Sequence, residues 1–403
     1  MKIFLKNRDL VIGGYLILMT LMFGACVEPF DIETELFDSA LVIEGTITDK
    51  METQQIKLSR TFRLESDQSE PENSAKVIVV GDDGSEYAFT SISDGIYESN
   101  YQFSAQQGIN YSLNVTTQDG RSYATKPAML NGTSIINDIS AIRTFQPIGG
   151  IDSEGIAILV DSENTSSNNR YYRYTYVETY EIRSYFDVIY KLIITDSGFK
   201  VVPKDKPDHI CYTTKSSKDI ILANTNILSD NNVKKLPVRF IDRNNRTLAY
   251  RYSILVRQLS LSREAYEFYE TLKELSGSES LFSQNQPGFL NGNVYSVDNP
   301  HEKVIGYFSV SPVDTKRFFF SFLDFFDISE RPAVEFDCEV TRPDYPAFRD
   351  RLTEFIQSGA KQFVGRAPRE HTAEGDGPYR VASSRCIDCT FYGTTEVPEF
   401  WIE

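Results

Sequence analysis

The residues that most often carry out catalysis or bind metals are scarce in this sequence. Its 403 residues include three histidines, His209, His301 and His371, which stand far apart and form no H-E-x-x-H motif. There is no G-x-S-x-G turn and no glycine-rich loop that ends in Gly-Lys-Ser or Gly-Lys-Thr. Acidic pairs are plentiful, but an acidic chain contains them by chance, so they do not indicate glycoside hydrolysis. We expect no catalytic residue, no metal and no cofactor.

Basic residues are also in short supply. The chain has 41 lysines and arginines against 57 acidic residues, a net charge of −16. Without residues 1–25, which hold three basic residues and one acid, the net charge is −18. Nucleic acids and anionic membrane surfaces attract patches of Lys and Arg, so this balance argues against both as partners.

One hydrophobic run stands out, and it is short. Leu10–Ala25 has no charged residue and follows Lys2, Lys6 and Arg8. As a helix it would be about 24 Å long, less than the roughly 30 Å hydrocarbon core of a bilayer. A basic start, a short apolar segment and small residues at its end predict a secretory signal peptide over residues 1–25.

Cys26 follows this segment directly. Gly24 and Ala25 are the small residues that lipoprotein signal peptidase accepts before a cysteine, although Phe23 stands where leucine is usual. We therefore predict that Cys26 carries a diacylglycerol, whose chains hold a protein on a membrane at about 0.8 kcal/mol per buried methylene. The alternative is an uncleaved membrane anchor, which the length and flanks of the run disfavour.

The chain becomes acidic immediately after Cys26, within a predicted tether of residues 26–37. The acids are Glu28, Asp31, Glu33 and Glu35. This segment resembles the signal that sends lipoproteins to the cell surface in the Bacteroidota. Alternatively, the same acids keep a solvated linker extended, because their negative charges repel one another.

Four cysteines remain once Cys26 is lipidated: Cys211, Cys338, Cys386 and Cys389. An even number in an oxidising compartment predicts two disulfides. A zinc site or a redox-active C-x-x-C pair is also possible, but a thioredoxin-like helix does not follow the pair. A bridge between Cys386 and Cys389 would be cramped, so the favoured pairing joins each of them separately to Cys211 or Cys338.

The length after cleavage suits two domains, and both are predicted to be mainly β. Residues 38–126 show period-two alternation, with turns at Asp83-Gly84, Asp94-Gly95 and Asp119-Gly120. This pattern predicts an immunoglobulin-like β-sandwich. Residues 127–403 predict a larger β-rich domain.

The larger domain is predicted to carry two amphipathic helices, near 262–275 and 345–358. The alternating tyrosines of residues 171–177 predict a half-buried sheet face in preference to a ligand platform. Residues 317–326 predict a strand buried on both faces. The long segment 276–300 is predicted to pack through its own apolar residues. If the chain has a partner surface in a loop, this segment is the first candidate for it.

Several stretches carry a family resemblance: "CVEPFDIE", "LVIEGTITD", "YRYSILVRQLSLSREAYEFYETLKEL", "GNVYSVDNPHEKVIGYFSVSPV" and "CIDCTFYGTTEVPEFW". With them the chain resembles a Bacteroidota lipoprotein family known only as a domain of unknown function, number forty-two forty-nine. Its members tend to be encoded beside TonB-dependent outer-membrane receptors of the SusC type. The resemblance implies a receptor barrel as partner and supplies no catalytic or ligand residue.

Together these features predict a lipid-anchored outer-membrane protein that faces the cell exterior. Its predicted role is that of a non-catalytic accessory or ligand-capture component of TonB-dependent uptake. A periplasm-facing structural or assembly lipoprotein is the alternative. An enzyme with no recognisable motif is a third possibility, since a fold does not dictate function.

Overall fold

The structure is a computed structural model, and it describes most of the chain. The described residues are 39–61, 70–165, 169–226, 231–277, 290, 292–332, 338–343, 348–367 and 377–402. Strands dominate these residues, so the prediction of a mainly β protein is confirmed. No helix among them has the length and apolar character to cross a membrane.

Ten strands form the largest sheet, in the order β18-β8-β7-β4-β5-β6-β2-β1-β19 with β3 paired to β2. Their bounds are β1 (Leu41–Thr48), β2 (Gln55–Arg60), β3 (Glu70–Pro71), β4 (Lys76–Gly81), β5 (Glu86–Ser93), β6 (Ile96–Ser99), β7 (Tyr111–Thr116), β8 (Ser122–Thr125), β18 (Val294–Ser296) and β19 (Ile305–Ser311). The predicted alternation is present: β1 buries Leu41, Ile43 and Ile47 and exposes Glu44. The predicted turns also occur, with Gly84, Gly95 and Gly120 at positive φ, where glycine is favoured.

Two strands of this sheet come from much later in the chain. β18 pairs antiparallel with β8, and β19 pairs in parallel with β1 from Val42↔Ile305 to Thr48↔Ser311. The predicted boundary between residues 126 and 127 is not tested as a domain division and stays a prediction. The pairing nevertheless shows that residues on both sides of it build one sheet.

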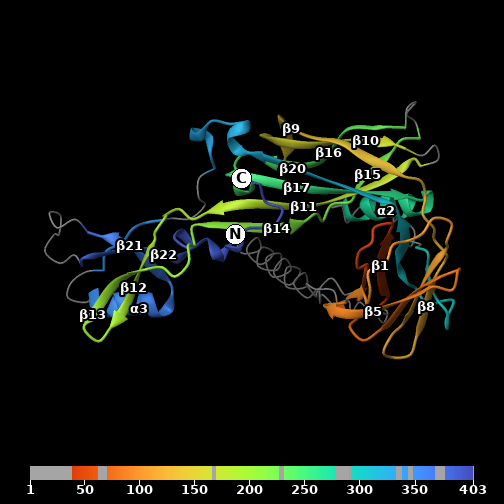
Figure 1. The fold of residues 1–403 in the computed structure, drawn as a ribbon, viewed down its shortest axis with the longest axis horizontal. Helices are drawn as coiled ribbons and strands as arrows, with labels where there is room; N and C mark the ends of the chain where they lie inside the picture. Colours follow the sequence, from red (N-terminus) through yellow and green to blue (C-terminus); the bar gives the residue numbers. More distant parts are fainter. Residues whose placement is uncertain are drawn as a thin grey trace, which may run out of the picture. The chain divides into compact units, whose positions relative to one another are not determined.

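Two further sheets pack face to face around a shared core. One has the order β16-β10-β9, from β9 (Ser134–Ile148), β10 (Ile151–Asn164) and β16 (Val233–Asp242). The other has the order β14-β11-β17-β20 with β15 paired to β11, and Figure 1 shows these strands side by side. Its strands are β11 (Tyr171–Arg183), β14 (Ile210–Ser216), β15 (Ile221–Asn224), β17 (Arg251–Leu261) and β20 (Val313–Ser321).

The tyrosine row of β11 lies inside this core. Tyr172, Tyr174 and Tyr176 are 1%, 0% and 5% exposed, and the hydroxyl of Tyr174 lies 3.1 Å from that of Ser162. The prediction of a half-buried face with hydroxyls reaching water is therefore wrong. The second sheet covers these side chains, and this contact between distant segments leaves no mark on the local alternation.

Residues 317–326 do not form one continuous strand. β20 ends at Ser321, and short 3-10 helices follow at η2 (Phe322–Asp324) and η3 (Ile328–Glu330). Phe320 is buried, whereas Phe319 on the opposite face of the strand is only partly buried. The predicted strand with two buried faces is thus too long, because aromatic content alone does not reveal that one face is open.

Both predicted helices are present. α2 (Arg263–Gly277) packs its apolar side on the ends of β17 and β19, and α3 (Phe348–Ser358) packs beside two small hairpins. The hairpins are β12 (Tyr190–Thr195) with β13 (Gly198–Pro203), and β21 (Lys361–Arg366) with β22 (Tyr379–Ser383). Three single turns of 3-10 helix complete the secondary structure of the described residues: η1 (Arg246–Leu248), η5 (Ser384–Cys386) and η6 (Cys389–Phe391).

One buried ion pair joins the two packed sheets. Glu178 on β11 is 5% exposed; its carboxylate accepts from Arg239 Nε at 3.1 Å and from the Tyr252 hydroxyl at 2.8 Å. Burial raises the pKa of Tyr252 well above its usual value, so this hydroxyl stays a donor. Arg239 is therefore the cation that compensates a carboxylate held away from water.

We predict that Arg239→Met lowers the free energy of unfolding by about 3 kcal/mol, because it leaves the Glu178 carboxylate buried without its partner. The matched control is Arg263→Met, since Arg263 pairs with Glu267 at side-chain exposures of 70% and 55%. Exposed pairs contribute about 0–1 kcal/mol. Chemical denaturation of both variants checks this, and equal losses would contradict it.

Candidate functional site

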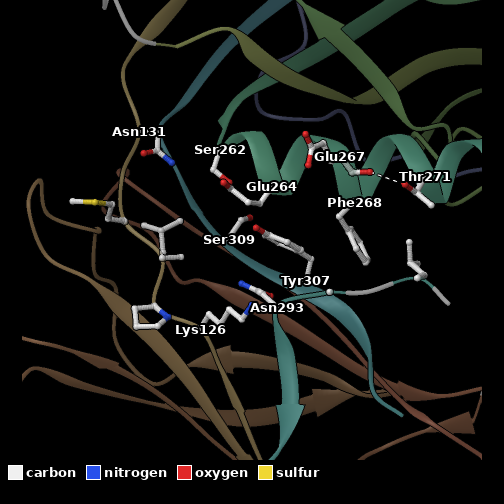
Figure 2. A pocket seen from close by; sticks show the side chains of 16 residues that line it. Lys126, Asn131, Ser262, Glu264, Glu267, Phe268, Thr271, Asn293, Tyr307 and Ser309 are labelled. Atoms are coloured by element: carbon white, nitrogen blue, oxygen red, sulfur yellow. Dashed lines mark hydrogen bonds between the residues drawn. The ribbon is translucent and has the colours of Figure 1, made fainter. Parts of the chain in front are cut away.

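A cavity with a volume of about 690 Å³ lies between α2 and the ten-stranded sheet. One wall is α2, and the other consists of β19, the segment from Lys126 to Asn131, and residues 292 and 293. Figure 2 shows the rings of Phe268 and Tyr307 between the helix and the sheet. The volume falls within the roughly 300–1,000 Å³ of small-molecule sites.

Helix α2 is capped at its first turn, and polar residues of the helix line the cavity. The Ser262 hydroxyl accepts from the backbone N–H of Ala265 at 3.1 Å, which satisfies a free donor of the first turn. Ala265 and Phe268 are buried against the sheet. Glu264 and Glu267 remain exposed on the cavity side, and Glu267 is also bonded to Arg263 at 2.7 Å.

Tyr307 on β19 forms the centre of the opposite wall. Its ring centroid lies 5.2 Å from that of Phe268, and its hydroxyl is hydrogen-bonded to Ser262. Burial raises the pKa of Tyr307, so the hydroxyl is neutral and serves as a donor or acceptor. Tyr307 therefore offers a polar group on a rigid aromatic support.

Asn293 closes the floor by bonding to the edge of β19. Its side-chain amide donates to the carbonyl of Phe308 at 2.7 Å and accepts from the N–H of Phe308 at 2.9 Å. Beside it, Gly292 approaches the backbone of Gly306 so closely that a Cβ on Gly292 would lie 1.6 Å from the Gly306 carbonyl oxygen. A residue with a side chain at 292 would push the floor away from β19.

Polar and apolar groups both line the cavity, and it contains charges of both signs. Lys126 lines it on the sheet side, and Glu264 and Glu267 line it on the helix side. Among its described lining residues there is no histidine or cysteine, and the Ser309 hydroxyl is bonded to Thr46 at 2.9 Å. This arrangement suits hydrogen bonding to a polar ligand, and it lacks the paired nucleophile and base of covalent catalysis.

The predicted lipidation and export residues fall outside the described residues. They are Cys26, Glu28, Asp31, Glu33 and Glu35. The same applies to His371. His209 lies within the described residues, where its Nδ1 is 2.8 Å from the Ser184 hydroxyl. No cluster of three or more potential metal-binding side chains occurs among the described residues.

The four remaining cysteines form two disulfides, Cys211–Cys389 and Cys338–Cys386. Cys386 and Cys389 are thus bonded to separate partners, the pairing that the sequence favours. The first bridge ties the C-terminal segment to β14, and the second ties η5 to residue 338. These cysteines stabilise the fold and do not line the cavity.

Sequence reasoning missed most of the cavity. The segment 276–300, singled out as a partner surface, does contribute Leu290, Gly292 and Asn293 to the lining. Tyr307 lies in a stretch that carries the family resemblance, but neither it nor Lys126 belongs to a motif of known chemistry. The two residues come near each other because β18 and β19 pair with strands near the N-terminus. The polar composition of the segment 276–300 was the one feature of the sequence that pointed to part of the cavity lining.

Comparison with known proteins gives one family match. The model described as "Domain of unknown function (DUF4249)" matches residues 27–317. No curated protein matches the chain. The crystal structure of a DUF4785 family protein from Legionella pneumophila subsp. pneumophila str. Philadelphia 1 is 11% identical, with a TM-score of 0.17. That match covers 54% of this chain and 52% of the other, so this chain spans about half of that protein's length and no argument rests on it.

The disulfides predict that the purified protein has no free thiol at Cys211, Cys338, Cys386 or Cys389. Mass spectrometry of peptides after alkylation without reduction checks this, and each bridge is expected to add about 2–4 kcal/mol to the free energy of unfolding. The matched variant is Cys338→Ser, which should leave the thiol of Cys386 as the one that is alkylated. Alkylation of all four thiols, or stoichiometric zinc, would contradict the assignment.

Proposed function

This chain belongs to the family of the domain of unknown function DUF4249, and from that premise we propose that it captures a polar ligand for an uptake system. Specifically, it is a non-catalytic accessory of a TonB-dependent outer-membrane receptor of the SusC type. The observation that carries the proposal is the 690 Å³ cavity under α2, which is lined by hydrogen-bonding groups without a nucleophile–base pair among its described residues. A concave pocket of this size with a few polar groups suits the binding of a small molecule.

In this proposal Cys26 anchors the protein in the outer membrane through its lipid. The acidic tether of residues 26–37 then exports it to the cell exterior. Support comes from the sequence: a short uncharged run, small residues before Cys26, and acids directly after it. The strongly negative net charge of the chain agrees with a body held away from anionic lipid surfaces.

The surface that we assign to the receptor is the tip of the β9–β10 hairpin. The strands continue beyond the core to a Gly149-Gly150 turn, where both glycines have positive φ. The tip exposes three large apolar side chains: Phe145 (64%), Ile148 (48%) and Ile151 (73%). Grouped apolar exposure of this kind is typical of protein interaction sites.

The base of this hairpin is held rigid by charges. Arg143 donates to Glu154 at 2.7 Å, and Arg243 bonds to Glu154 at 3.0 Å and to Glu330 at 3.2 Å. Arg143 also stacks on the ring of Phe326 at 4.5 Å. A rigid base presents the apolar tip with little loss of conformational entropy on binding, which favours association.

Residues 38–126 form, in our proposal, an immunoglobulin-like sandwich that acts as the stem between the anchor and the cavity. Its support is a run of short antiparallel strands from β1 to β8 around one apolar core. The strands β18 and β19 extend this unit and bring it to α2.

We predict that a tagged protein purified from native outer membranes in mild detergent brings a TonB-dependent barrel with it. Phe145→Asp should lower the recovered barrel about tenfold, because the contact would bury a charge. Tyr101→Asp is the control, since Tyr101 is 82% exposed in the loop after β6, away from the β9–β10 hairpin in sequence.

Recovery of the lipidated protein without a barrel would contradict this partnership. Protease treatment of intact cells is the companion measurement for orientation. Cleavage supports the surface location, and full protection would instead support a periplasm-facing assembly role.

We further predict that filling the cavity lowers uptake of the barrel's cargo. Met129 is 38% exposed and lines the cavity, so Met129→Trp narrows it without disturbing the core. Met51→Trp is the matched control, because Met51 is 66% exposed and does not line the cavity. In cells lacking the chromosomal gene, the first variant should restore uptake several-fold less than the second, and equal rescue would contradict ligand capture.

A further inference from the structure

A second cavity, of about 450 Å³, lies on the outer face of the five-stranded sheet, away from the core. Its lining combines arginine with aromatic side chains. The principal groups are Arg183, Arg251, Arg331, Tyr212, Tyr250 and Trp401. Nothing in the family match assigns a role to it, and it shares no lining residue with the cavity under α2.

The charge of this cavity is opposite to that of the whole chain. Its lining contains three arginines and one acidic residue, Glu181, which gives a local charge of +2 in a chain whose net charge is −16. Glu181 is paired with Arg183 at 2.5 Å, so it leaves Arg251 and Arg331 uncompensated by carboxylates among the lining residues. A cavity with low-dielectric walls concentrates such a field and attracts anions.

Two of the guanidinium groups are held in place by one tyrosine. The guanidinium carbons of Arg183 and Arg331 each lie 4.6 Å from the ring centre of Tyr250. This stacking orients the planar groups before any ligand arrives, which reduces the entropy lost on binding. A guanidinium that stacks through its face keeps its N–H donors in the plane of the group, where they can bond to an anion.

Arg331 has an unmet hydrogen-bond requirement. Its Nε is buried, and no partner for it exists among the residues that the structure describes. A buried donor without an acceptor typically costs about 1–3 kcal/mol, more when it is charged. An anionic oxygen in the cavity would satisfy it.

The C-terminal segment completes the site. The Cys211–Cys389 disulfide ties this segment to β14, and Gly393 lies so close to the strand that a Cβ would meet the Tyr212 carbonyl oxygen at 2.4 Å. Trp401 then packs edge-on against Tyr212, at 4.9 Å between ring centres. Arg251 donates through Nε to the carbonyl of Ile402 and through a terminal nitrogen to Ser321 at 3.2 Å.

We propose that this cavity is a binding site for a small ligand that carries a carboxylate or phosphate group. Arginine forks match both groups, and the half-buried aromatic rings pack against the rest of such a ligand. The inference does not rest on the proposed uptake function, because it uses a different cavity and different residues.

The test uses Trp401, the single tryptophan of the chain, as an internal reporter. The purified full-length protein is titrated at constant ionic strength with inorganic phosphate, with benzoate, and with neutral benzamide. We expect a saturable change in tryptophan fluorescence with at least one of the two anions and none with benzamide. The comparison of phosphate with benzoate shows which of the two groups the site accepts.

Arg331→Gln should weaken anion binding about tenfold, because it removes a charge-assisted hydrogen bond. Arg351→Gln is the matched control, since Arg351 is exposed on α3 and lies outside the cavity. If Arg331→Gln fails to fold by circular dichroism, Arg183→Gln replaces it, because its side chain is 40% exposed. No saturable response to either anion, or equal affinity in the cavity variant and the control, would overturn the proposal.

Discussion

Side chains on β11 and β17 alternate between two faces, and the rest of the structure depends on this alternation. One set enters the core, where Tyr174, Tyr252 and Glu178 meet the opposing three-stranded sheet. The other set faces outward, which places Arg183 and Arg251 together with no sheet above them. A shift of one residue in the register of either strand would exchange the two sets, burying the arginines and exposing the tyrosines. The buried Glu178–Arg239 pair opposes such a shift, since it forms in one register only.

The parallel pairing of β1 with β19 has a comparable effect at the other end of the molecule. More than two hundred residues separate these strands in sequence, yet seven consecutive residue pairs join them. The pairing carries Tyr307 beneath α2, and Asn293 then fixes the floor through two hydrogen bonds to Phe308. The cavity under α2 is therefore a consequence of a long-range strand pairing. The loss of chain entropy in forming it is offset by the apolar core that the ten-stranded sheet encloses.

The sequence was informative where the interactions are local. The Asp94-Gly95 turn, the Ser262 cap of α2 and the end of α3 near Gly359 follow from backbone preferences of single residues, and the structure has all three. The separate partners of Cys386 and Cys389 also followed, because geometry disfavours a bond across two residues, whereas the choice between Cys211 and Cys338 for each did not. The burial of Tyr174 did not follow, and neither did the end of β20 at Ser321. Both depend on which face of a strand another sheet covers, and alternation is the same in either case.

By itself, the sequence determined the mainly β character of the chain, its family, its two amphipathic helices and the separate partners of Cys386 and Cys389. Composition, alternation, caps and residue spacing carry that information within short windows. Only the tertiary structure decided which groups share a cavity. Tyr307 joins Lys126, and Arg331 joins Trp401, through strand pairings, a disulfide and aromatic stacking between segments far apart in the chain. The physical reason is that such contacts are selected by the total apolar area and hydrogen bonding of the whole fold, which no short stretch of residues encodes.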